Sequence, residues 1–479
     1  MLFNSYYFLL VFFPVVFIGY RLLNRFKFFG SAKILLVSGS IYFYGFFKPG
    51  YVPIFVISIL INYCLCRKIQ TAKSETVRRW VTALGCVMNL GVLGYFKYTG
   101  FLFENLNLLF DRQFAIPNIV LPLGISFYTF QQLSFLIDCY RGDRTKYSLS
   151  DYALFVTFFP QLIAGPIVLP SEMLPQFADP ARKVINWQNM NQGLFLFACG
   201  LAKKCFIADS LAFIVTQGFD TGTQLTFAEG WIVSLAFTFQ LYFDFSGYCD
   251  MASGIARMFN IDLPLNFDSP YQATDFQSFW RRWHMTLGRF MMNYLYIPLG
   301  GNRKGTVRTL LNLLIVFLVS GLWHGAGWLF LIWGGLHGSG ILIHRLWRYV
   351  MEKKFNGWKL PKIPSILLTF FFVNIFWIFF RATTLRRAWD IVKSMFDFAH
   401  IAGFSKEFRR VMGSFDISRD LLFTIFAAAA VIVFLLPNSA KWQRFFEKHP
   451  CLRIITTAGF FFIGFICISR KSPFLYFNF

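Results

Sequence analysis

Two histidines lie in strongly apolar surroundings, forty residues apart in the chain. His284 follows a Trp-Arg-Arg-Trp run, and His324 lies in a Gly-Leu-Trp-His-Gly run. Long apolar runs elsewhere in the chain predict a membrane protein, and ionisable side chains inside a membrane usually face a cavity and carry function. Imidazole titrates near neutral pH, so it can take up a proton and return it. We therefore expect the chemistry of this protein at His284 and His324.

Acyl transfer to a sugar hydroxyl is one reaction that suits the pair. Neutral His324 would take the hydroxyl proton, and His284 would orient the substrate or donate to the developing oxyanion. The alternative is that each is a satisfied structural histidine, the commoner role of a lone buried imidazole. His337 and His344 share one face of a predicted helix, and no third metal ligand lies nearby in the sequence. Helix packing or an interfacial position is therefore favoured for them over a metal pair.

Three polar residues end an apolar stretch further upstream: Gln240, Asp244 and Ser246. Asp244 could pair with Arg281 or Arg282, or it could bind a sugar or the amide groups of a thioester donor. A buried ion pair that fixes the helix bundle is an equal alternative. Both readings remain open at this point.

The charge of the chain is strongly positive. It carries 46 Lys and Arg against 23 Asp and Glu, a formal net charge of +23. The basic residues cluster between apolar runs, which is typical of cytoplasmic loops and gives no reason to expect a nucleic-acid partner. The same charge would attract an anionic nucleotide-bearing thioester, and Arg281, Arg282 and Arg289 could contact its phosphates. They could equally anchor the cytoplasmic side.

Apolar runs recur along the whole chain, which is 56% hydrophobic with 65 Phe and a mean hydropathy of +0.52. Such runs predict an all-α polytopic membrane protein with about 11–13 membrane-embedded helices in a single domain, residues 1–479. The runs lie at about 6–20, 33–47, 51–66, 80–97, 119–138, 152–168, 191–215, 229–248, 310–323, 327–346, 364–380, 420–436 and 454–469.

Loop charge predicts the orientation of the chain. The basic segments 21–33 and 67–79 are expected in the cytoplasm, so the N-terminus lies outside and the first run is a retained helix. Segment 249–309 is too polar for lipid and too aromatic for a plain loop, so it predicts short amphipathic and re-entrant helices that line a cavity. Segment 400–419 predicts a loop with a short surface helix.

Several other chemistries lack sequence support. The nine cysteines show no zinc-type spacing and lie mainly in apolar runs, so we expect buried thiols and no disulfide framework. The chain has no Gly-x-Ser-x-Gly elbow, no Walker loop, no dinucleotide fingerprint and no His-Glu-x-x-His motif. We predict no metal site and no permanently bound cofactor.

Taken together, the motifs resemble those of the membrane-bound O-acyltransferases, in particular the bacterial alginate O-acetyltransferase type. The matching segments are 1–5, 121–127 (Leu-Pro-Leu-Gly-Ile-Ser-Phe), 159–167 (Phe-Pro-Gln-Leu-Ile-Ala-Gly-Pro-Ile), 243–248 (Phe-Asp-Phe-Ser-Gly-Tyr), 281–284 (Arg-Arg-Trp-His), 296–303 (Tyr-Ile-Pro-Leu-Gly-Gly-Asn-Arg), 321–326 (Gly-Leu-Trp-His-Gly-Ala), 377–382 (Trp-Ile-Phe-Phe-Arg-Ala) and 473–477 (Pro-Phe-Leu-Tyr-Phe). Apart from the opening segment 1–5, they run from about residue 120 to the C-terminus.

The resemblance implies a ring of tilted helices around a central funnel from the cytoplasm, in a bacterial inner membrane. It implies that His324 is catalytic and that His284 assists. Acetyl-CoA would be the donor, and an extracytoplasmic partner protein or the exported polysaccharide itself, alginate-like or peptidoglycan, would be the acceptor. Membrane lipid surrounds the chain, and no fused transferase domain is evident. The predicted substrate-binding residues are Trp323, Asp244, Ser246, Gln240, Arg281, Arg282 and Asn302.

Two other classes of function remain as alternatives. Asp244, Arg281 and His284 would also suit a proton-coupled transporter or flippase of a sugar or lipid-linked precursor. A structural scaffold for a secretion complex is the other. Only the enzyme consumes a thioester, so release of free CoA separates it from both.

Overall fold

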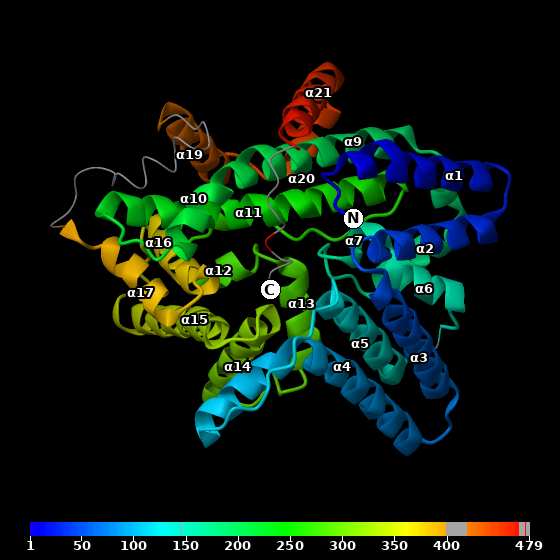
Figure 1. Ribbon diagram of the computed structural model, residues 1–479, viewed down its shortest axis with the longest axis horizontal. Coiled ribbons are helices and arrows are strands. Elements are labelled where there is room, and N and C mark those ends of the chain that lie inside the picture. The colour runs from blue at the N-terminus through cyan, green and yellow to red at the C-terminus, as the bar shows by residue number, and fades with distance from the viewer. Residues whose placement is uncertain (144, 399–418, 469–474, 476–479) are drawn as a thin grey trace. The chain divides into compact units, whose positions relative to one another are not determined.

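The computed structural model describes residues 1–143, 145–398, 419–468 and 475, and every regular element among them is a helix. Two compact units are formed, one from residues 1–198 and 248–264 and the other from residues 199–247 and 265–479. The first unit contains η1 (Phe8–Phe12), α1 (Phe13–Arg25), α2 (Phe29–Gly45), η2 (Pro49–Tyr51), α3 (Val52–Thr71), α4 (Glu75–Phe110), α5 (Ile125–Arg141), α6 (Leu149–Thr157), α7 (Phe159–Leu162), α8 (Pro170–Ala178), η3 (Pro180–Lys183) and most of α9 (Trp187–Ala202). In this unit α3, α4 and α5 pack side by side (Figure 1).

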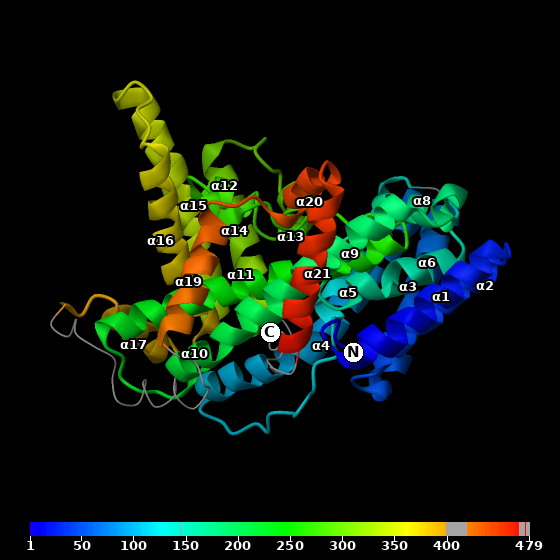
Figure 2. The same cartoon turned by 90° about the horizontal axis from the view of Figure 1, so that it is seen from above.

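The second unit holds both histidines of interest. Its elements are η4 (Lys203–Ala208), α10 (Asp209–Asp220), most of α11 (Phe227–Met258), η5 (Pro270–Gln272), α12 (Phe276–Trp280), α13 (Met285–Met291), η6 (Met292–Tyr296), α14 (Thr306–His324), α15 (Trp328–Lys354), α16 (Lys362–Arg381), α17 (Leu385–Ser394), α19 (Arg419–Phe434), α20 (Ser439–Glu447) and α21 (Pro450–Cys467). Helices α14, α15 and α16 pack in sequence order, as Figure 2 shows from above.

The all-α polytopic class predicted from the sequence is confirmed. Within the described residues, five helices are long and apolar enough to cross a membrane: Phe8–Arg25, Pro49–Thr71, Thr306–His324, Lys362–Arg381 and Pro450–Cys467. The bent pair Asp420–Phe434 and Ser439–Glu447 would make a sixth if it forms one span. The ring of helices around a funnel and the single domain stay predictions.

Helix boundaries depart from the apolar runs where Pro and Gly intervene. The run predicted at 119–138 becomes helical only at Ile125, because Pro122 precedes it and Gly124 adopts a φ of +68°. The run at 152–168 is divided into α6 and α7, and Pro160 opens the second of these. Segment 249–309 does form short helices, as expected. Segment 400–419 lies almost wholly outside the described residues.

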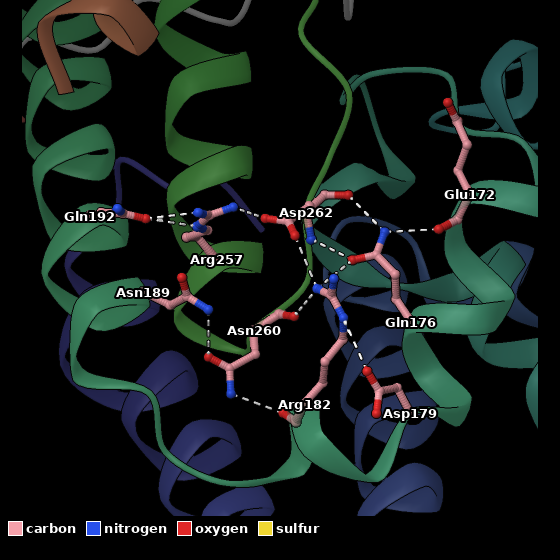
Figure 3. Close-up of polar contacts among 9 residues, drawn as sticks. All are labelled: Glu172, Gln176, Asp179, Arg182, Asn189, Gln192, Arg257, Asn260 and Asp262. Carbon is pink, nitrogen blue, oxygen red and sulfur yellow. Dashed lines mark hydrogen bonds and ion pairs between the residues drawn. The ribbon is translucent and has the colours of Figure 1, made fainter. Parts of the chain in front are cut away.

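A network of polar side chains fixes the end of α11 within the first unit (Figure 3). Arg182 donates to the Asn260 carbonyl oxygen at 2.7 Å and to the Asp262 carboxylate at 3.0 Å. Arg257 of α11 forms an ion pair with the same carboxylate and donates to Gln192 Oε1 of α9 at 3.0 and 2.8 Å. Because one acid bridges two guanidinium groups, α9, α11 and the segment after α8 are held together.

One cysteine pair corrects the sequence prediction. Cys66 of α3 and Cys139 of α5 form a disulfide, with Cα atoms 6.2 Å apart. The expectation of no disulfide was wrong for this pair. The two cysteines are 73 residues apart and match no spacing pattern, so only the packing of α3 against α5 brings them together.

Glycines set the distance between α14 and α15. A Cβ atom at Gly321 would overlap the carbonyl oxygen of Phe330, and one at Gly334 would overlap the carbonyl oxygen of Phe317. The two backbones therefore touch where α14 ends in His324. Small residues permit this close approach between membrane helices.

We predict that Gly334→Ala destabilises the protein by about 1–3 kcal/mol, because its methyl group forces the two helices apart. The neighbouring Gly335→Ala is the matched control, since its Cβ would lie 3.8 Å from Leu318 Cδ2, an ordinary contact. Thermal unfolding of the detergent-purified variants measures the difference. Equal melting temperatures for the two variants would show that the close crossing contributes nothing.

Candidate active site

The structure brings the two histidines together. His284 lies between α12 and α13, His324 is the last residue of α14, and their ring centroids are 6.4 Å apart. The two residues are only 1% and 4% exposed. Two imidazoles from separate segments thus meet in one buried place, where a proton donor and a proton acceptor can act on one substrate.

An unusual backbone turn presents His284. Its φ of 46° lies in the left-handed region, which costs a residue other than glycine conformational energy. Two backbone hydrogen bonds hold the turn: the Asp268 N–H donates to the Arg282 carbonyl oxygen, and the Met285 N–H donates to that of Asn266, both at 3.0 Å. The segment around Asn266 therefore determines where the His284 ring points.

Aromatic rings enclose His324. Trp323, Trp333 and Phe380 lie with ring centroids 4.8, 5.1 and 5.3 Å from its imidazole. At the next residue, Gly325, a Cβ atom would overlap the ring of Phe330. The glycine after the histidine is thus explained by close approach of a side chain. Trp323 also lies 6.1 Å from the ring of His284, so it borders both imidazoles.

His337 and His344 take part in helix packing. The Trp280 indole N–H donates to His337 Nδ1 at 3.3 Å, and the fully buried His337 ring packs on Trp333 at 5.1 Å. His344 Nε2 lies 3.7 Å from Asp275 Oδ1. Within the part of the chain that the structure describes, no group of three or more metal-ligating residues is found.

A cavity of about 1020 Å³ lies beside His284. Residues 277–304, together with parts of α14 and α15, supply its walls, as the sequence predicted for segment 249–309. Its described lining residues include five cations and no carboxylate; the cations are Arg281, Arg289, Arg303, Lys304 and Arg345. Asn302 is also part of the wall. A cavity of one charge sign focuses its field on an anionic ligand.

Some predicted site residues lie elsewhere. Arg282, Gln240 and Ser246 are not among the described residues that line the cavity, and the last two are buried within α11. Their assignment to substrate binding stays a prediction. The same is true of Trp323, which borders the histidines without lining the cavity.

Asp244 has a different partner from the one expected. Lys204 Nζ lies 2.6 Å from its carboxylate and 2.7 Å from that of Asp209, and all three side chains are at most 3% exposed. The other oxygen of Asp244 accepts from the Leu475 N–H at 2.8 Å. Of the alternatives given by the sequence, pairing with Arg281 or Arg282 was wrong, and the structure shows the buried ion pair within the helix bundle. Lys204 is within reach because a close glycine contact lets the backbone of α9 approach that of α11.

Two contributors were missed in the sequence. Asn266 lies in no recognisable motif, and only its contact with His284 reveals it. Arg345 comes from α15 and joins cations that lie some forty residues or more upstream. The excess of positive charge was the available signal for the cavity, and it does not identify individual residues.

Comparison with known proteins places both histidines inside a family match. The family model described as "MBOAT, membrane-bound O-acyltransferase family" matches residues 126–385. The peptidoglycan O-acetyltransferase of Helicobacter pylori is 42% identical, covering 100% of this chain and 98% of that protein. The probable alginate O-acetylase AlgI of Azotobacter vinelandii is 38% identical over 83% of this chain and 78% of its own length. A teichoic acid D-alanyltransferase of Streptococcus thermophilus is 25% identical over 47% of this chain and 57% of its own length.

We predict that Lys204→Met destabilises the protein by about 3–5 kcal/mol, because it removes the cation that two buried carboxylates share. Lys203→Met is the matched control, since Lys203 is less buried than Lys204 and its Nζ lies 3.4 Å from a neutral hydroxyl, Ser439 Oγ. Thermal unfolding in detergent measures both variants. A Lys204→Met protein as stable as the control would contradict a structural role for the ion pair.

Proposed function

Because the chain belongs to the membrane-bound O-acyltransferase family, we propose that it takes an acetyl group from cytoplasmic acetyl-CoA and passes it across the membrane for O-acetylation of an exported polysaccharide. Its relatives are named for peptidoglycan and alginate acetylation, and these two polymers are the candidate acceptors. The observation that carries the proposal is the buried histidine pair beside a cationic cavity.

The cavity suits a nucleotide-bearing thioester. Its volume of about 1020 Å³ lies at the upper end of ordinary ligand pockets, which range over roughly 300–1000 Å³. Arginine forks bind phosphate oxygens in pairs, and four of the five cations are arginines. The acyl end of such a donor would lie toward His284, the one histidine among the described residues of the cavity wall.

The histidines would act as follows. His324 accepts the proton of the acceptor hydroxyl as its oxygen attacks the thioester carbonyl carbon. The tetrahedral oxyanion then collapses, the carbon–sulfur bond breaks, and the thiolate leaves and takes up a proton. His284 assists at the same centre. One O–H bond and one C–S bond are exchanged for one C–O bond and one S–H bond, so no oxidant or metal is required.

A site in the middle of the membrane would let the donor bind from one compartment and the acceptor from the other. CoA is large and charged, whereas an acetyl group is small and neutral and needs no water-filled path. The donor therefore stays on the cytoplasmic side of a bacterial inner membrane, with the N-terminus outside according to the loop charges. The acceptor is a separate extracytoplasmic protein or the polysaccharide itself.

We predict that the purified protein in detergent, supplied with its acceptor and with acetyl-CoA carrying a labelled acetyl group, releases free CoA, and that His324→Ala abolishes the release while the fold is retained. His449→Ala is the control, because this exposed histidine lies far along the chain between α20 and α21. An intact thioester with the wild-type protein and its acceptor, accompanied by substrate movement in vesicles, would instead identify a transporter.

We predict that Arg345→Ala raises the KM for acetyl-CoA about tenfold, equivalent to ~1.4 kcal/mol, with little change in kcat. The KM for acetyl-pantetheine, which lacks the nucleotide, should not change. Arg348→Ala on the same helix is the control, since Arg348 is exposed and pairs with Glu352. A parallel loss with both donors would argue against phosphate binding by Arg345.

A further inference from the structure

We propose that Asn266 is a positioning residue that holds His284 in the tautomer protonated at Nδ1, so that Nε2 is the nitrogen with the lone pair. The contact that carries this is between Asn266 Oδ1 and His284 Nδ1, at 3.1 Å. Its meaning for catalysis rests on the function proposed above. The tautomer itself can be measured without any reaction.

The amide atom of Asn266 that faces the His284 ring is identified by its other hydrogen bonds. Asn266 Oδ1 accepts from the Thr286 backbone N–H at 3.2 Å and from the Thr286 hydroxyl at 2.9 Å. A backbone N–H can only donate, so the atom opposite it must be the amide oxygen and not the amide nitrogen. Thr286 thereby fixes the orientation of an amide that could otherwise be flipped.

The second step assigns the proton on the imidazole. An amide oxygen has no hydrogen to give, so His284 Nδ1 must be the donor in its contact with Asn266. A neutral imidazole carries one N–H, so Nε2 bears none. In this tautomer neutral His284 can accept a hydrogen bond through Nε2 but cannot donate one. Of the two roles left open by the sequence, orienting the substrate through a group that donates to Nε2, such as an amide N–H, is favoured over donating to the oxyanion, because the single hydrogen of the acceptor hydroxyl goes to His324.

The hydrogen-bonded group around His284 is rigidly held. Asn266, Thr286 and His284 are all at most 2% exposed, so water does not compete for these hydrogen bonds. The Asn266 carbonyl oxygen also accepts from the Met285 N–H, which ties the backbone on both sides of the ring to one residue. The next ring along, Phe267, packs 5.1 Å from Trp283. The orienting amide is held by both its main chain and its side chain.

The charge of the orienting group also matters. His284 lies outside the five candidate spans, and burial lowers its pKa to about 3, so the ring is neutral at physiological pH. His324 on α14 faces the His284 ring, Arg281 and Arg289 line the same cavity as His284, and α11 presents the ring of Phe245. A carboxylate in place of Asn266 would stabilise the imidazolium. An amide orients the ring and leaves it neutral.

Nitrogen-15 spectra of the full-length protein labelled at histidine test the tautomer directly. Comparison with His284→Gln identifies the His284 signals. We expect a protonated Nδ1 and an unprotonated Nε2 in the wild type, and a mixture of tautomers in Asn266→Leu. A proton on Nε2 of the wild-type ring would overturn the proposal, even if acetyl transfer requires His324.

The activity arm uses Asn266→Asp. By raising the pKa of His284, the carboxylate should move the acidic limb of the pH–rate profile toward higher pH, by at least one unit. Asn374→Asp is the control, because this buried amide contacts Ser234 and Thr238 on α11 and would alter stability without moving the limb. An unshifted limb in Asn266→Asp would refute the positioning role. If the wild-type protein shows no acetyl transfer at all, that result would contradict the proposed function but not the tautomer of His284.

Discussion

The proposed active site depends on burying two imidazole rings side by side, His284 at 1% and His324 at 4% exposure. Burial disfavours the charged form of any ionisable group. The residues around these rings must therefore meet their hydrogen-bonding needs without placing an opposite charge beside them. The structure does this with an amide on one ring and aromatic faces around the other. A base that is neutral before the reaction can accept a proton when substrate arrives.

The second unit also separates its charges. Lys204 holds Asp209 and Asp244 in a buried cluster. By contrast, all the charged side chains among the described residues of the cavity wall are cations. A carboxylate in that wall would pair with an arginine and weaken its attraction for phosphate. Sequestering the acids of α10 and α11 behind one lysine therefore keeps the cavity electropositive. One set of ionic groups is thus paired and buried, and the other lines the cavity in which we propose that the anionic donor binds.

Periodic and local features of the sequence were good predictors, and contacts between distant segments were not. The apolar runs identified the helices, and the two histidine motifs identified a pair that does meet in space. The partner of Asp244 was missed because a buried carboxylate pairs with whichever cation the packing of distant segments brings close to it. Asn266 was missed because its role depends on a left-handed backbone conformation at His284, which could not be predicted from the residue types in this segment.

The two histidines differ in what they face. His284 is part of the cavity wall, whereas His324 lies beyond it among Trp323, Trp333 and Phe380. Under the proposed function, a donor in the cavity would meet His284 first and extend its acyl end toward His324, whose ring centroid lies 6.4 Å from that of His284. This ordering suits a large anionic donor that stays where the cations are and presents a small acyl group at its tip. In the proposed reaction the acceptor hydroxyl gives its single hydrogen to His324, so the lone pair on His284 Nε2 is left to orient a donor group of the substrate.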